Sequence, residues 1–287
     1  MHLALLTAVA FFGWAIGDIC TTIASRKIGS YSSVFYTTLL GVIIFAILIP
    51  SHFSELKNYT LPLFLLNIVI ASLLTIANLS YVTALQKSNA SIVSAIAGSF
   101  PAVTVILSVL FLRQPITSLQ VIAIVVISIG IILSTLNLQD LKNKHIWHDP
   151  SLRLALLAML CWGSFYAFLK PISIHVGWFW PIYFAFWFFP FVFLYMRRQE
   201  MSLEKPTTNG ALPFILITAI LMRSAEVSFN SAMSSGNTSF VAPVAGSYPI
   251  LFVLIAAYLF KDPIKKPQKF GIAITLIGIV WLSWLSS

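Results

Sequence analysis

The sequence is poor in charged residues and contains only two cysteines. Charged side chains make up 9% of the 287 residues, whereas an ordinary soluble domain has about 25%. Because a soluble protein of this length needs a more polar surface, the composition indicates a membrane protein. Cys20 and Cys161 both lie within apolar runs, which favours buried thiols over a disulfide or a metal site.

Motifs of cofactor and catalytic chemistry are also missing. The chain has no CxxC, no HExxH, no P-loop, no glycine-rich nucleotide turn and no nucleophile constellation. The one HxxH pair, His145 and His148, lies in a loop without a cysteine nearby. We therefore expect no cofactor, no metal and no enzyme activity, and we do not expect ATP to drive the protein.

Basic residues exceed acidic ones, for a net charge of +9, but they are scattered in short loops between apolar runs. This is typical of lysine and arginine at the cytoplasmic face of a bilayer and leaves no basic face for nucleic acid. We expect a multi-pass protein of the plasma membrane or bacterial inner membrane. The first apolar run lacks a basic segment before it and continues to Ala24, so we expect it to remain as a helix.

Ten runs of about 20 apolar residues, the length that crosses a hydrocarbon core of about 30 Å, divide the chain. They predict an all-α protein with ten transmembrane helices, separated by loops that contain charge, proline, glycine or asparagine. The predicted ranges are 3–24, 31–49, 61–85, 91–112, 119–136, 152–171, 178–196, 212–233, 240–260 and 270–285.

Two stretches, 88–133 and 236–282, carry the same pattern at a constant offset of 148 residues. Twelve residue types coincide without a gap, including a Gly-Ser-aromatic-Pro sequence at 98–101 and 246–249. Such self-similarity indicates an internally duplicated protein.

The longest polar interval, 137–151, is the expected linker between repeats at 1–136 and 152–287. Each repeat holds five predicted spans. Because five is odd, the second repeat must enter the bilayer from the side opposite to the first, which predicts inverted repeats. Secondary transporters often have this arrangement, with the substrate near the midplane where the repeats meet.

The pattern Gly-Ser-aromatic-Pro…Pro-Ile…Gln…Ile-Gly at 98–130 and 246–278 resembles the EamA-like branch of the drug/metabolite transporter superfamily, and the likeness covers the whole chain. The resemblance implies a ten-helix carrier that moves small metabolites or drugs by alternating access, often outward. Family members often carry a glutamate after the fourth and ninth helices, where this chain has Gln114 and Asp262.

The predicted helix 212–233 places Arg223, Glu226 and Asn230 on one face. An ionised group at this depth costs about 2.5 to 3.5 kcal/mol and is a functional candidate by default. The alternative is that the two charges only neutralise one another. In the first repeat Glu226 corresponds to neutral Asn78, which we include among the candidate substrate contacts. One arginine in the site suggests an anionic or zwitterionic solute.

The first predicted helix carries Asp18 four residues after Trp14. Asp18 is a candidate proton carrier or the partner of Arg223. The alternative is a carboxylate near the helix end that reaches water at the lipid headgroups. Both Trp14 and Asp18 are candidate site residues.

In the sixth predicted helix, Trp162, Tyr166 and Lys170 recur every four residues. We expect Trp162 and Tyr166 to contact substrate. Because Pro171 follows Lys170 and is expected to end the span, the lysine is predicted to reach the membrane interface. The aromatic run 178–191 has two interpretations, a stacking wall for a planar ligand or an aromatic belt facing lipid.

Pro101 and Pro249 lie about halfway along the fourth and ninth predicted helices. They predict paired kinks that loosen the carbonyls of Ala97 and Ala245 and line a cavity. The alternative is helix packing, with serine hydroxyls bonded back to their own helix. The candidate ligand groups beside the kinks are the hydroxyls of Ser99, Ser247 and Tyr248.

The leading hypothesis is a secondary transporter of a small organic solute. One alternative is an intramembrane enzyme acting on a lipid-linked substrate, with Asp18, Glu226 and Arg223 as acid, base and anion clamp. Another is a membrane scaffold without transport activity.

Loop charges predict the orientation. Thirteen lysine and arginine residues follow odd-numbered spans and three follow even-numbered ones. By the positive-inside rule the odd loops are cytoplasmic and both termini lie outside, whereas the family resemblance implies cytoplasmic termini. We expect a reporter that is active only in the periplasm to be active when fused after Ser287. A signal from a cytoplasm-only reporter at the same site would reverse the assignment.

Overall fold

The computed structural model describes residues 2–113, 117–135, 150–234, 241, 244–261 and 264–285, and the secondary structure among them is helical. In the first half the elements are α1 (His2–Ile28), α2 (Ser30–Ala46), α3 (Ile49–His52), η1 (Phe53–Asn58), α4 (Leu61–Lys87), α5 (Ala90–Ala97), α6 (Phe100–Leu112) and α7 (Ser118–Thr135). In the second they are α8 (Pro150–Val176), α9 (Phe179–Phe186), α10 (Phe189–Arg198), η4 (Thr208–Gly210), α11 (Leu212–Ser234), α13 (Tyr248–Leu259) and α14 (Lys266–Leu285).

Six of the described helical segments are long and apolar enough to cross a membrane. They are α1, α4, α8, α11 and the consecutive pairs α5 with α6 and α9 with α10. The bent pair of α2 with α3 and η1 would make a seventh, and three shorter apolar helices lie at Ser118–Gly130, Val244–Leu259 and Lys269–Leu282. The all-helical, multi-pass class is therefore confirmed, while ten crossings stay a prediction.

The second predicted span is not straight. It bends by 67° after α2, where the last turn tightens and the Ile47 amide bonds to the Ile44 carbonyl. Pro50 then lies in the first turn of α3. Because proline has no amide hydrogen to continue the helix, the direction of the chain changes here.

The fourth predicted helix is divided, rather than kinked within one continuous helix. α5 ends at Ala97 and α6 begins at Phe100, so Pro101 lies in the first turn of α6, where a missing amide hydrogen costs nothing. The same arrangement recurs at Pro249, in the first turn of α13. The two breaks are close together, since a Cβ atom on Gly98 would lie 3.1 Å from Cγ of Pro249.

The predicted end of the sixth span at Pro171 is wrong. α8 continues through Pro171 to Val176. A single proline removes one backbone hydrogen bond, which helices in membranes tolerate. Lys170 is exposed on this continuing helix.

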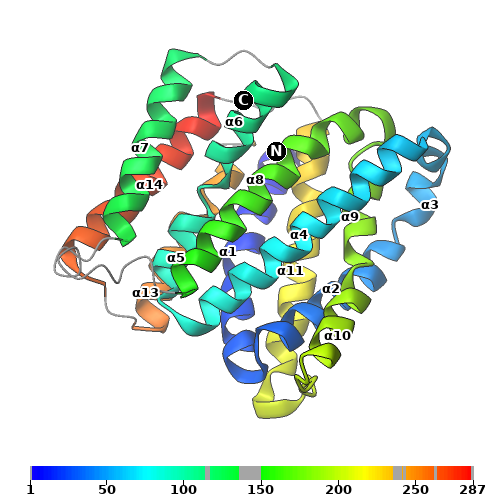
Figure 1. The fold of residues 1–287 in the computed structure, drawn as a ribbon, viewed down its shortest axis with the longest axis horizontal. Helices are drawn as coiled ribbons and strands as arrows, with labels where there is room; N and C mark the ends of the chain where they lie inside the picture. The colour runs from blue at the N-terminus through cyan, green and yellow to red at the C-terminus, as the bar shows by residue number, and fades with distance from the viewer. Residues whose placement is uncertain are drawn as a thin grey trace.

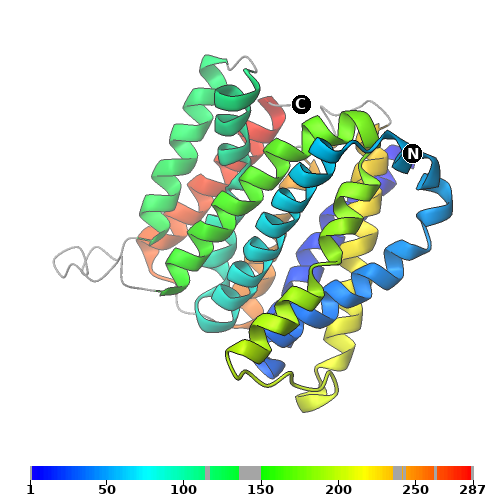
Figure 2. The ribbon, with the colours of Figure 1, turned by 45° about the vertical axis from the view of Figure 1, so that its right-hand side comes forward.

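The packing of the helices repeats between the two halves. α1 packs against α11 and α13, and its counterpart α8 packs against α4 and α6. α2 contacts α11 as α9 contacts α4, while α7 pairs with its own counterpart, α14. Figures 1 and 2 show α7 and α14 side by side at one edge of the bundle. These pairs map onto one another when the halves are exchanged, as expected of a duplicated chain, but the contacts of α4 with α1 and α2 have no comparable counterparts among the described residues.

Both ends of the described chain lie toward the upper end of the bundle in Figures 1 and 2. α1 begins there and α14 ends there. The predicted ten crossings would likewise place both termini on one side.

Two corresponding glycines allow α7 and α14 to approach closely. A Cβ atom on Gly130 would lie 2.6 Å from the backbone nitrogen of Thr275, and one on Gly278 would lie 2.7 Å from Cγ1 of Ile127. Thr275 and Ile127 occupy equivalent positions of the two repeats. Small residues at such crossings let the backbones touch, which is how membrane helices gain packing energy.

We expect Gly130→Ala to destabilise the protein by about 1 to 3 kcal/mol, because the new methyl group would overlap the backbone of α14. Thermal unfolding in detergent measures the effect. The control is Ser128→Ala, which introduces the same residue on the exposed side of α7. A Gly130→Ala protein as stable as this control would show that the crossing is loose.

Candidate functional site

A cavity of about 140 Å³ lies where the two halves meet. It is lined by residues from α1, α2, α4 and α6 of the first half and from α8, α9, α11 and α13 of the second. An apolar cavity of about 150 Å³ holds a molecule the size of benzene. The space therefore suits a small organic molecule.

Eight of the eleven residues predicted to bind substrate line this cavity. They come from α1, α4, α8, α11 and α13, so segments far apart in the sequence converge on one space. These residues are Trp14, Asp18, Asn78, Trp162, Tyr166, Arg223, Glu226 and Tyr248.

Three predicted residues do not line the cavity. The Ser99 hydroxyl donates to the Ala95 carbonyl at 2.8 Å, and the Ser247 hydroxyl donates to the Val244 carbonyl at 2.7 Å. The Asn230 amide donates to the Glu226 carbonyl at 2.7 Å. Each of these donors bonds to a backbone carbonyl three or four residues earlier in the chain, so the packing interpretation fits these residues better than ligand binding.

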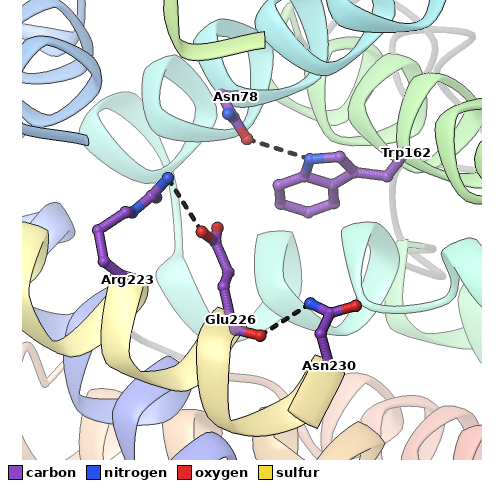
Figure 3. A network of polar contacts seen from close by, with 5 residues as sticks. All are labelled: Asn78, Trp162, Arg223, Glu226 and Asn230. Atoms are coloured by element: carbon purple, nitrogen blue, oxygen red, sulfur yellow. Dashed lines mark hydrogen bonds and ion pairs between the residues drawn. The ribbon is translucent and has the colours of Figure 1, made fainter. Parts of the chain in front are cut away.

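The two charged side chains on α11 form an ion pair with one another. Nη1 of Arg223 lies 3.1 Å from Oε2 of Glu226, and the side chains are 12% and 23% exposed (Figure 3). The guanidinium also lies over the ring of Phe186, 4.1 Å from its centre. Nε of Arg223 has no hydrogen-bond partner among the described residues. One edge of the guanidinium is thus left for a ligand or water.

Asn78 and Trp162 join the two halves across the cavity wall. Nε1 of Trp162 donates to Oδ1 of Asn78 at 3.1 Å, as Figure 3 shows. The bond links α8 to α4 and fixes the orientation of the indole. Tyr81, which sequence reasoning missed, packs on the same indole with ring centres 4.8 Å apart.

Asp18 is 4% exposed and accepts a hydrogen bond from the Tyr81 hydroxyl at 2.9 Å. It is not the partner of Arg223, because that arginine is paired with Glu226. Two threonines near Asp18 do not turn their hydroxyls to the carboxylate. Thr21 donates to the Gly17 carbonyl, and Thr22 to the backbone carbonyl of Asp18 itself.

The cavity lining follows the sequence repeat. At the offset of 148 residues, Trp14 corresponds to Trp162 and Phe100 to Tyr248, and all four line the cavity. The contacts also correspond, since the ring centres of Trp14 and Tyr248 lie 5.5 Å apart and those of Trp162 and Phe100 lie 6.0 Å apart. Corresponding residues of the two halves therefore line the cavity together.

This correspondence is the signal that sequence reasoning missed. The offset of 148 residues found for 88–133 also applies to the first and sixth predicted helices. There it pairs Trp14 with Trp162 and Asp18 with Tyr166. Phe100 would also have been found as the counterpart of Tyr248. Tyr81 carries the same signal, since it corresponds to Phe229, whose ring centre lies 5.1 Å from that of Trp14. Phe186 carries none, because it corresponds to Thr38 and lies in a helix rich in aromatic residues.

A sequence model of the EamA-like transporter family matches residues 2–136 and matches again at 150–284. The chain belongs to the EamA-like transporter family. The double match agrees with the duplication, and membership makes this a transmembrane protein of a transporter family. The positions Gln114 and Asp262, where EamA-like repeats often carry glutamate, lie outside the described residues, as do His145 and His148.

Two further similarities were found. An uncharacterized protein of Methanocaldococcus jannaschii, MJ1333.1, is 46% identical over 70 residues, which is 24% of this chain and 51% of that protein. This EamA-like chain thus matches about half the length of that relative. A solved structure described only as "Crystal structure of protein" matches 99% of this chain and 96% of its own, with a TM-score of 0.67 and 13% identity. That likeness supports the fold.

The ion pair on α11 predicts how the stability of the protein changes when one or both of its charges are removed. Arg223→Gln leaves the Glu226 carboxylate without its partner in a poorly hydrated site, so we expect a loss of about 3 to 5 kcal/mol in thermal unfolding. The double variant Arg223→Gln with Glu226→Gln removes both charges and should recover most of this loss. A double variant as unstable as the single one would show that the pair is not what stabilises these groups.

Proposed function

We propose that this chain is a secondary transporter that exports a small organic solute by alternating access between two inverted repeats. The main support is the cavity, whose walls are corresponding residues of the two repeats. A site between two repeats that are related by a pseudo-two-fold axis opens to the opposite side of the membrane when the repeats exchange conformations. A binding site within one half would not respond in this way.

The proposal includes ten membrane crossings, five in each repeat. The six long segments, the bent pair and the three shorter apolar helices supply ten candidates. The repeats are proposed to span 1–136 and 152–287, with a linker at 137–151. The odd number of crossings per repeat makes the repeats inverted, and the cell membrane is the proposed location.

In the proposed mechanism, the aromatic side chains enclose the solute while Asp18, Asn78, Arg223 and Glu226 supply polar contacts. Asp18 is the proposed proton carrier, because it lines the cavity and has no ion-pair partner among the described residues. Protonation of this carboxylate removes a charge from the cavity. Solute and proton movement can then be coupled.

The direct test is purified protein in liposomes, supplied with a panel of labelled amino acids, sugars, nucleotides and ammonium compounds. We expect at least one solute to accumulate unchanged. A chemically modified product would instead support an intramembrane enzyme, and no accumulation by a folded protein would contradict the proposal.

The variant that tests proton coupling is Asp18→Asn. We expect accumulation driven by a pH gradient to fall at least ten-fold, because the amide cannot carry the proton. Tyr81→Phe removes the hydroxyl bonded to Asp18 but keeps the carboxylate, and should keep most of the response. A full response to the pH gradient in both Asp18→Asn and Glu226→Gln would exclude the coupling.

A further inference from the structure

The charge balance of the cavity differs from what one arginine suggests. Among the described residues that line it, three are charged, Asp18, Arg223 and Glu226. Arg223 is neutralised by Glu226 at 3.1 Å and covered on one face by Phe186. The remaining charge is the carboxylate of Asp18. A ligand therefore meets a surplus of negative charge.

Among the described residues, the carboxylate of Asp18 accepts one hydrogen bond, from the Tyr81 hydroxyl, and the ring of Tyr81 packs on the indole of Trp162. A carboxylate that is 4% exposed and lacks a cation is unstable unless it takes up a proton or a cation. The neighbouring Thr21 and Thr22 hydroxyls are bonded to backbone carbonyls and do not compensate the charge.

Aromatic rings are the largest group among the remaining lining residues, seven of sixteen. Trp14 and Tyr248 pack together on the side of α1, and Trp162, Phe100 and Tyr166 follow one another on the side of α8. The negative face of such rings attracts cations, most strongly those that shed water easily. The guanidinium of Arg223 over Phe186 already makes this contact within the cavity wall.

Two of the polar groups that could accept hydrogen bonds from a ligand are already in use. Oδ1 of Asn78 accepts from Trp162, and Oδ2 of Asp18 accepts from Tyr81. A primary ammonium group has three N–H donors that need acceptors, whereas a quaternary ammonium group has none. The volume of about 140 Å³ limits the ligand to a small molecule.

From these observations we infer that the cavity binds a small organic monocation, a quaternary or methylated ammonium compound, with its charge beside Asp18 and its methyl groups against the rings of Trp14, Trp162, Phe100 and Tyr248. This rests on the proposed function and names the class of solute. It replaces the anionic or zwitterionic solute suggested by the sequence. An anion would meet an arginine whose charge Glu226 already balances, and it would lie in the same cavity as the carboxylate of Asp18.

The first experiment measures binding of labelled choline to the purified full chain in detergent, with two competitors of similar shape. 3,3-Dimethylbutan-1-ol has the same branched head without charge, and betaine carries a carboxylate in addition to the ammonium group. We expect tetramethylammonium to displace choline, and we expect both competitors to be at least ten-fold weaker than unlabelled choline. Equal competition by the neutral alcohol or by betaine would overturn the assignment.

Variants then locate the site. Asp18→Asn should weaken choline binding at least ten-fold and Asp18→Glu should keep it, while Glu200→Gln removes an exposed carboxylate outside the cavity as the control. Tyr248→Leu should also weaken binding. Its matched control is Tyr258→Leu, the same change on the same helix at a residue that is 84% exposed. Unchanged binding in a folded Asp18→Asn or Tyr248→Leu protein would overturn the site.

Choline counterflow in liposomes separates this inference from the proposed function. Binding together with counterflow supports both. Binding without counterflow keeps the cation site but contradicts the transporter. Accumulation of other solutes from the panel, without choline binding, keeps the transporter and overturns the cation assignment.

Discussion

The structure depends on one constraint, which is that polar groups inside a membrane-spanning bundle must find partners within the protein. Most side-chain hydroxyls meet this constraint locally, as those of Thr21, Thr22 and Ser99 do by bonding to carbonyls one turn back. The charges that lie well within the predicted spans are drawn together in one place. Asp18, Arg223 and Glu226 line a single cavity between the halves.

The scaffold around the cavity is symmetric, whereas its chemistry is not. Trp14 and Trp162 occupy equivalent positions and have equivalent ring contacts. At the polar positions the repeats differ, because Glu226 corresponds to Asn78 and Asp18 corresponds to Tyr166. Duplication thus supplies the walls, and divergence of a few residues supplies the charge that distinguishes one ligand from another.

Sequence reasoning located the helices and most of the cavity, for physical reasons. Apolar length predicts a crossing directly, and charges such as Arg223 and Glu226 cannot face lipid without a large free-energy cost. The family is confirmed by the match to both repeats. The bend after α2 and the continuation of α8 past Pro171 were missed, because proline is compatible with a break, a bend or a continuous helix according to its neighbours.

Partner choice was the part that sequence could not decide. A polar side chain on a helix can bond to its own backbone or turn toward another helix, and the choice depends on what lies opposite in space. Ser99 and Asn230 bond locally, whereas Asn78 reaches Trp162 and Asp18 meets Tyr81. Asp18 lies 63 residues from Tyr81, so no local pattern links them.

The asymmetry of the polar residues also bears on alternating access. In the conformation described, Trp162 donates to Asn78, while its counterpart Trp14 faces a cavity in which Glu226, the counterpart of Asn78, is held by Arg223. If the halves exchange conformations as proposed, the indole of Trp14 comes to lie beside Glu226, just as the indole of Trp162 now lies beside Asn78. A carboxylate is a stronger acceptor than an amide, but it must first release Arg223. Identical repeats would give the two conformations of the transporter equal free energies. The differences at these polar positions make the free energies unequal. A bound solute, or a proton on Asp18, can then shift the equilibrium between the two conformations.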